Sequence, residues 1–108
     1  MAGGLRRGDV HLCQFAAPDK KRPVVLLTRA SILGHLGTVT VAPITSTIRG
    51  VVSEVVLDLE DGMKGPCAVN LHNIATIPLD RIGKRVCSLR ESKLRQLCAS
   101  MKYALGCD

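Results

Sequence analysis

Aromatic side chains are nearly absent from this sequence, which has one phenylalanine (Phe15), one tyrosine (Tyr103) and no tryptophan. Proteins that bind single-stranded nucleic acids usually stack the bases on aromatic rings. Two such rings do not make a stacking platform. If a nucleic acid is the partner, its recognition must depend on phosphate contacts, arginine side chains and hydrogen bonds from amides.

Long apolar runs are also missing. No stretch approaches the roughly 20 residues that a helix needs to span a bilayer. Arg6 and Arg7, near the start, are not followed by the apolar core of a signal peptide. The sequence therefore predicts a cytoplasmic protein that has no membrane partner.

The chain has five cysteines, but their spacing is not typical of a metal site. No two cysteines stand as in a zinc ribbon or a CxxC redox motif, and their odd number fits a reducing compartment. His11 and Cys13 alternate on one predicted strand, but two ligands alone make a poor zinc site. We expect no metal and no cofactor. We also expect Cys13, Cys67 and Cys98 to be small buried hydrophobes and Cys107 to be exposed.

Length and charge set the remaining limits. A chain of 108 residues predicts a single domain over residues 1–108, and 46% hydrophobic residues are enough for a packed core. Lysine and arginine number 15 against 9 aspartate and glutamate, which gives a net charge of +6. This excess favours a polyanionic partner, either a nucleic acid or an acidic protein segment.

Short apolar segments predict a mostly β fold with one helix, of the α+β class. Residues 24–28 are apolar almost throughout, which is typical of a central strand buried on both faces. Pro43 is expected to stop regular pairing after Ala42. Residues 31–37 contain two glycines and predict a connection with at most a turn of helix. The expected strands cover residues 9–15, 24–28, 38–42, 51–57, 67–71 and 73–77.

An amphipathic helix is predicted at the end of the chain. Its apolar stripe consists of Leu94, Leu97, Cys98, Met101 and Leu105. Ser88 and Glu91 match a capping box, which places the first helical residue at Leu89, and Gly106 is expected to end the helix. Short strands followed by such a helix predict a strongly curved sheet or half-open barrel that the helix caps.

Polar groups stand at the ends of two predicted strands. Arg22 opens the strand that begins with Pro23, and the hydroxyl side chains of Thr45, Ser46 and Thr47 follow another strand. If these strands pair antiparallel, the arginine and the hydroxyls meet at one end of the sheet, where they could bind a phosphate. The alternative is that Arg22 merely ends a strand and that the hydroxyls bond to their own turn.

The segments Lys21-Arg22-Pro23-Val24-Val25-Leu26-Leu27 and Val39-Thr40-Val41-Ala42-Pro43-Ile44-Thr45-Ser46-Thr47 carry a resemblance. With Arg6-Arg7-Gly8-Asp9-Val10 and Asn73-Ile74-Ala75-Thr76-Ile77, they resemble the MazF/PemK family, toxins of bacterial type II toxin–antitoxin systems. The resemblance extends over about residues 6–106. It implies an SH3-like barrel of the MazF/PemK/CcdB type with a C-terminal amphipathic helix that starts near Glu91.

The resemblance also implies an activity. Members of the family are endoribonucleases, or mRNA interferases, which cut single-stranded RNA selectively and without a metal by attack of a ribose 2′-hydroxyl. By this resemblance Arg22 and Thr45 are the catalytic residues. The family further implies a homodimer and an acidic antitoxin protein that binds in the groove, which agrees with the positive net charge.

Basic and hydroxyl side chains near the Arg22 end are candidates for RNA binding. They are Lys20, Lys21, Ser46, Thr47, Arg49 and Lys64. For each of the basic residues, an ordinary solvated side chain is the alternative. A second basic group, around the predicted start of the helix, either extends this face or binds nothing: Arg81, Lys84, Arg85, Arg90, Lys93 and Arg95.

Other readings of the sequence remain open. A histidine is the natural general base for RNA cleavage, but His35 and His72 fall in turns and His11 is expected to point off the first strand. A protein-directed poison like the gyrase-directed CcdB toxins would share the fold, although the aromatic C-terminus of that family is absent here. A catalytically silent relative that binds nucleic acid or only its antitoxin is the third alternative.

Overall fold

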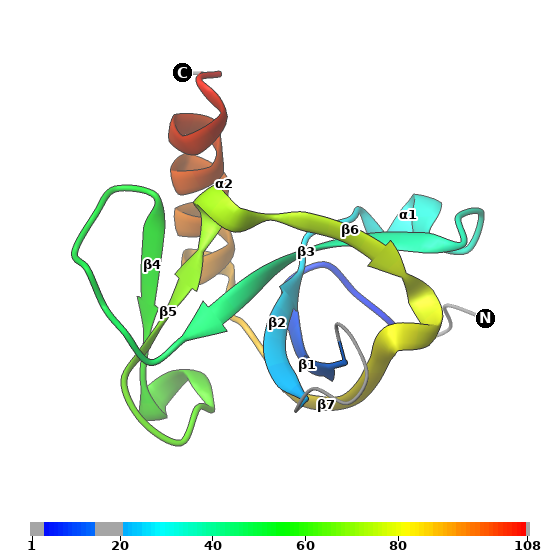
Figure 1. The fold of residues 1–108 in the computed structure, drawn as a ribbon, viewed down its shortest axis with the longest axis horizontal. Coiled ribbons are helices and arrows are strands. Elements are labelled where there is room, and N and C mark those ends of the chain that lie inside the picture. Colours follow the sequence, from blue (N-terminus) through cyan, green and yellow to red (C-terminus); the bar gives the residue numbers. More distant parts are fainter. Residues whose placement is uncertain (1–3, 15–20, 108) are drawn as a thin grey trace.

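The computed structural model describes residues 4–14 and 21–107 (Figure 1). Its strands are β1 (Asp9–Cys13), β2 (Arg22–Leu26), β3 (Thr38–Thr45), β4 (Glu54–Leu57), β5 (Cys67–Asn70), β6 (Ala75–Pro78) and β7 (Ile82–Ser88). Its helices are α1 (Ala30–Leu33) and α2 (Glu91–Leu105), with 3-10 turns η1 (Leu59–Asp61), η2 (Leu71–Asn73) and η3 (Leu79–Arg81).

The strands form one antiparallel sheet in the order β4-β5-β3-β2-β1-β7, and β6 pairs with β3. In Figure 1, β1, β2, β3, β6 and β7 curl around a common centre, while β4 and β5 extend from the far end of β3. In the described part of the chain β6 and β7 do not pair with each other, so the barrel stays open between them. The predicted class, a mostly β fold with a half-open barrel and a C-terminal helix, is confirmed.

Strand β2 is buried on both faces, as predicted, and separates two apolar cores. Val24 and Leu26 belong to the core inside the barrel, whereas Val25 and Leu27 belong to the core on the opposite face of the sheet. Helix α2 packs on this second core through Leu97, which is 1% exposed. The predicted packing of the helix on the curved sheet is therefore confirmed, and the face it covers is the one opposite the barrel interior.

The stripe itself also differs from the prediction. Leu94, Met101 and Ala104 pack beside Leu97, whereas Leu105 is 56% exposed. The capping-box prediction is wrong as well, since Arg90 is the N-cap without a side-chain bond and the helix begins at Glu91. The register implied by the family resemblance is thus the correct one, and Gly106 ends the helix in the left-handed conformation as expected.

Several strand boundaries differ from the prediction. Strand β2 begins two residues before the predicted range 24–28, and β6 begins two residues into the predicted range 73–77. Strand β7 was not predicted, because most of its side chains are exposed on an edge strand and show no apolar alternation. Strand β3 continues through Pro43, since its last two residues leave β2 and pair with β5. Strand β4 begins at Glu54 rather than Val51. The predicted end of the first strand at Phe15 lies outside the described residues.

The five cysteines are all free. Cys13 and Cys67 are buried and Cys107 is exposed, as predicted, but Cys98 is only half-buried and accepts a hydrogen bond from the Arg7 guanidinium at 2.6 Å. In the described residues, no helix has both the length and the apolar character needed to cross a membrane.

A glycine at the turn after η1 gives a test of the packing. Gly62 has φ +98°, and a Cβ there would lie 2.7 Å from Cβ of Cys87. Gly62→Ala should lower the free energy of unfolding by about 1–3 kcal/mol, because an alanine at positive φ is strained. Urea denaturation measures the change. Gly65→Ala is the control, since nothing lies within 4 Å of its Cβ position, and equal midpoints for the two variants would contradict this account.

Candidate active site

The pairing of β2 with β3 brings the predicted catalytic residues to one end of the sheet. The strands run antiparallel with Val24 opposite Pro43, so that β2 begins with Arg22 where β3 ends with Thr45. The predicted placement of the arginine and the hydroxyl cluster is confirmed. Pairing of Thr45 with Ala68 of β5 fixes the end of β3 against a second strand.

A groove of about 640 Å³ opens at this end of the sheet, within the range of about 300–1,000 Å³ that is typical of ligand sites. Four of the predicted site residues line it, namely Arg22, Thr45, Ser46 and Lys64. The other lining residues are mostly apolar: Leu12, Pro23, Ile44, Met63, Gly65, Pro66, Cys67 and Val86. A basic and hydroxyl-bearing rim over apolar walls suits a ligand with a charged phosphate and flat bases.

Arg22 supplies a fixed positive charge in this groove. It is exposed, its backbone pairs with Cys13 of β1, and Pro23 follows it directly. The described residues offer it no carboxylate partner in an ion pair. Its guanidinium can therefore direct a planar pair of donors at a phosphate.

Thr45 is held by its own turn. Its Oγ1 accepts a hydrogen bond from the backbone N–H of Thr47 at 3.1 Å. The alternative hypothesis, in which the hydroxyls bond to their own turn, predicted this hydrogen bond. The same bond leaves the hydroxyl hydrogen of Thr45 to be donated, so the turn orients a donor at the groove rather than consuming it.

The loop after Thr45 is organised by a residue that the sequence did not single out. Glu54 is 8% exposed, and its Oε1 accepts hydrogen bonds from the backbone N–H groups of Arg49 and Gly50, both at 3.0 Å. Its Oε2 is buried and has no partner among the described residues. The available signal was the one acidic residue within the apolar segment 51–57.

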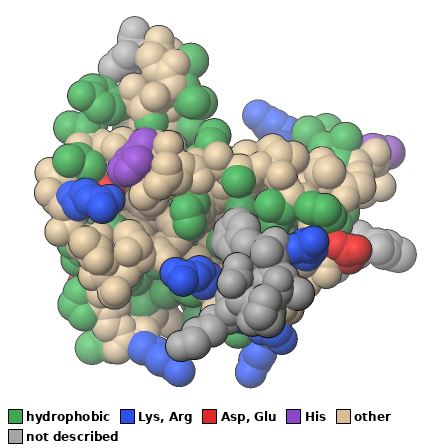
Figure 2. Space-filling view, viewed as in Figure 1, with side chains coloured by type: hydrophobic (Ala, Val, Ile, Leu, Met, Phe, Trp, Pro, Cys, Tyr) green, Lys and Arg blue, Asp and Glu red, His purple; other side chains and the backbone are tan. Residues whose placement is uncertain are grey.

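The remaining predicted binding residues lie around the groove rather than in it. Lys21 is exposed and lines a neighbouring hollow. Thr47 and Arg49 are exposed on the loop between β3 and β4 and do not line the groove. Lys20 lies outside the described residues. Figure 2 shows one face of the molecule, over which basic side chains are spread and acidic ones are sparse.

The histidines do not line the groove. The prediction that His11 points off the first strand is wrong: it is buried, and its Nδ1 donates to the carbonyl of Gly83 at 2.9 Å. It shares a strand face with Cys13, which lies in the barrel core. His35 is exposed, as expected, and the exposed His72 has its Nδ1 2.6 Å from Oγ of Ser53.

Cys67 is the one thiol among the groove-lining residues described. Burial raises the pKa of this thiol, and the negative charge of Asp61 raises it further. The thiol therefore stays protonated near neutral pH. It serves as an apolar wall and not as a nucleophile or base.

The chain is similar to known proteins over most of its length. Residues 6–105 match the model of the PemK-like, MazF-like toxins of type II toxin–antitoxin systems. Endoribonuclease MazF3 of Mycobacterium tuberculosis is 38% identical over 92% of this chain and 93% of that protein. Probable endoribonuclease MazF2 of the same organism is 35% identical over 95% of this chain and 100% of that protein.

A solved structure, the Mycobacterium tuberculosis toxin MazF-mt6, superposes with a TM-score of 0.85 at 38% identity. The match covers 93% of this chain and 98% of that toxin. Sequence and fold thus agree over the strands that build the groove and over most of the rest of the chain. The chain belongs to the PemK-like, MazF-like toxin family of type II toxin–antitoxin systems.

Proposed function

We propose that this toxin is a metal-independent endoribonuclease that cuts single-stranded RNA at selected sequences. The observation that carries the proposal is the groove that Arg22 and Thr45 share, with Ser46 and Lys64 on the same rim. Relatives that are 35–38% identical are named endoribonucleases, which supports the same activity for this chain.

In the proposed reaction, the ribose 2′-oxygen attacks the adjacent phosphorus and the bond from phosphorus to the 5′-oxygen breaks. The products are a 2′,3′-cyclic phosphate and a 5′-hydroxyl, so the proton lost from the 2′-hydroxyl is balanced by one gained at the 5′-oxygen. Arg22 stabilises the extra negative charge on the phosphoryl oxygens. It does not act as a proton donor, because a guanidinium group is not deprotonated in proteins.

Thr45 donates its hydroxyl hydrogen to a phosphoryl oxygen while the Thr47 amide holds the Thr45 oxygen in place. Ser46 and Lys64 bind the same or an adjacent phosphate from the groove rim. Thr47, Arg49 and Lys21 contact the RNA to either side, and Lys20 is proposed with them from the sequence alone. Among the described residues, no three His, Cys, Asp or Glu side chains gather as metal ligands.

The proposed partners are an acidic antitoxin protein and a second copy of this chain. A toxin of a type II system is paired with an antitoxin, and a net charge of +6 favours an acidic segment in the basic groove. Several large apolar side chains are exposed and available for such contacts: Val51, Val52, Val56, Leu59, Tyr103 and Leu105. We place the activity in the cytoplasm, where RNA and antitoxin are both present.

The test is cleavage of a long, mixed-sequence RNA by the purified chain in EDTA. We expect discrete cuts that persist in EDTA, with 5′-hydroxyl ends and a shared sequence around each cut. Mapping of both ends distinguishes 2′-hydroxyl attack, which leaves a 2′,3′-cyclic phosphate, from hydrolysis by an activated water, which leaves no cyclic phosphate. If a folded, antitoxin-free protein cuts none of several RNAs, the proposal fails and a protein-directed poison takes its place.

A further inference from the structure

A second hollow adjoins the groove at Leu12 of β1. It measures about 450 Å³, and its lining is richer in polar side chains than that of the groove. Its described lining residues are Leu12, Gln14, Lys21, Asp80, Arg81, Ile82 and Gly83. Leu12 lines both spaces, so the hollow continues the groove past a single side chain.

The strand register explains this continuity. Leu12 lies opposite Pro23, and Lys21 immediately precedes Arg22, the cation of the groove. An RNA strand whose scissile phosphate lies at Arg22 therefore meets Lys21 as the next cation along the rim. This places the hollow within one residue of the proposed reaction centre, in the direction of the turn between β6 and β7.

The far wall of the hollow is built by paired hydrogen bonds. The backbone N–H of Gln14 donates to the carbonyl of Arg81, and Nη1 of Arg81 donates to the carbonyl of Gln14, both at 3.2 Å. The second bond holds the guanidinium against the end of β1. The hollow thus carries an anchored positive charge on one side and the exposed Lys21 on the other.

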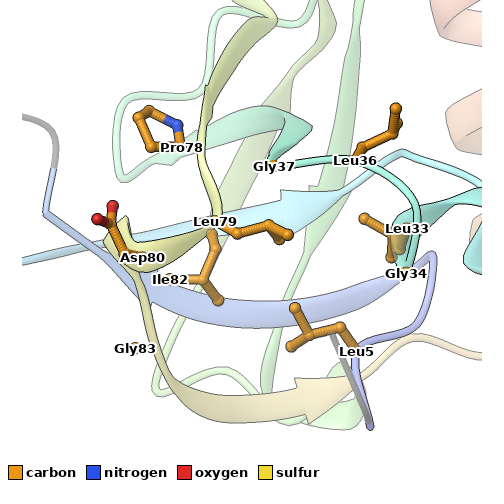
Figure 3. Close-up of a pocket in the computed structure, with 10 residues that line it drawn as sticks. All are labelled: Leu5, Leu33, Gly34, Leu36, Gly37, Pro78, Leu79, Asp80, Ile82 and Gly83. Atoms are coloured by element: carbon orange, nitrogen blue, oxygen red, sulfur yellow. The ribbon is translucent and has the colours of Figure 1, made fainter. Parts of the chain in front are cut away.

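Asp80 is the feature that a phosphate site alone does not explain, because a carboxylate repels phosphate. A carboxylate does accept hydrogen bonds from the amino groups of nucleobases. Asp80 also borders an apolar cavity of about 620 Å³ between α1 and η3. Figure 3 shows its carboxylate directed away from the side chains of Leu5 and Leu33 in that cavity.

We propose that this hollow is a subsite for the nucleotide next to the scissile phosphate, and the inference rests on the proposed endoribonuclease function. Lys21 and Arg81 bind its phosphate, and Leu12 contacts the base that passes over it. Asp80 accepts a hydrogen bond from an amino group of the base. The subsite therefore prefers cytosine, adenine or guanine, which carry an amino group, over uracil, whose one donor on that edge, N3–H, lies between two carbonyl oxygens that repel the carboxylate.

The first test uses Lys21→Glu, an exposed position whose change should not affect folding. Lys102→Glu is the matched control, since Lys102 is exposed on α2 and lines neither the groove nor the hollow. Both are assayed on an RNA oligonucleotide with one mapped cut site, and on versions shortened one nucleotide at a time from each end. Lys21→Glu should lower kcat/KM about tenfold on the full oligonucleotide, as the loss of one charged phosphate contact implies.

The difference between Lys21→Glu and the wild type should vanish once the neighbouring nucleotide has been removed from one end. Lys102→Glu should stay within about twofold at every length, as for a screened surface charge. An equal loss at all lengths, or an equal loss in both variants, would mean general attraction to RNA and would overturn the subsite. If the wild type cuts no RNA, the proposed function is wrong, and the subsite proposal, which rests on it, is wrong too.

The second test is Asp80→Asn, which keeps the size of the side chain and gives it an amide donor. The cuts mapped on the long RNA should include more sites that have uracil next to the cut. The preference against uracil at that position should be about fivefold or more weaker than in the wild type. Cleavage of the best wild-type site should continue, because Asp80 does not contact the scissile phosphate. An unchanged preference at every position near the cut would overturn the role of Asp80.

Discussion

Replacing Arg22 with alanine should leave the protein folded and lower the rate of RNA cleavage by about 100- to 1,000-fold, the usual effect of losing one donor to a transition-state oxyanion. Arg22 is exposed in the groove and forms no ion pair among the residues described, so its loss leaves no buried charge behind. The measurement is single-turnover cleavage of a mapped RNA site, with circular dichroism to verify the fold.

Two further variants separate charge from geometry. Arg95→Ala removes the same charge from an exposed position of α2, where the side chain is 70% exposed, and should change cleavage little. Arg22→Lys keeps the charge but loses the planar pair of donors, and should remain at least about tenfold below the wild type. Activity of Arg22→Ala within threefold of the wild type would remove Arg22 from the reaction.

The central strands could be predicted because burial on both faces leaves a continuous apolar run. Residues 24–28 have this pattern, and β2 occupies most of that range. Strand β7 could not be found in this way, since Lys84, Arg85 and Val86 are exposed on an edge strand that pairs, within residues 4–14 and 21–107, with β1 alone. Val51 and Val52 continue an apolar run but lie in a loop, because hydrogen bonds to Glu54 hold that segment in a turn.

Whether a site residue could be predicted depends likewise on whether its strand could be predicted. Arg22 and Thr45 stand at the ends of two adjacent strands, so antiparallel pairing alone brings them to one groove. Val86 and Arg81 reach the groove or its neighbouring hollow only through β7 and the turn before it. Val86 was missed as a lining residue, and Arg81 was named only within a basic group that either extends this face or binds nothing. His11 was misplaced because the period of a strand gives two faces but does not say that both are buried.

Replacement of Glu54 is expected to have the second large effect, on both stability and cleavage. Glu54→Ala should lower the free energy of unfolding by about 2–4 kcal/mol, because two backbone N–H groups lose a charged acceptor in a buried place. The loop from Ser46 to Ser53 should loosen, and hydrogen exchange at the Arg49 and Gly50 amides should speed up. Since Thr45 stands at the start of this loop, cleavage should also fall, by about tenfold or more.

Glu54→Gln decides whether the two hydrogen bonds or the negative charge matter. A glutamine oxygen can accept from both N–H groups, and its amide replaces Oε2, which has no partner among the described residues. The glutamine variant should therefore recover most of the stability and slow exchange at Gly50. If Glu54→Gln is as unstable as Glu54→Ala, the charge stabilises the loop. If Glu54→Ala loses stability but cleaves RNA like the wild type, the loop does not position Thr45, and the groove is fixed by the pairing of β3 with β5 alone.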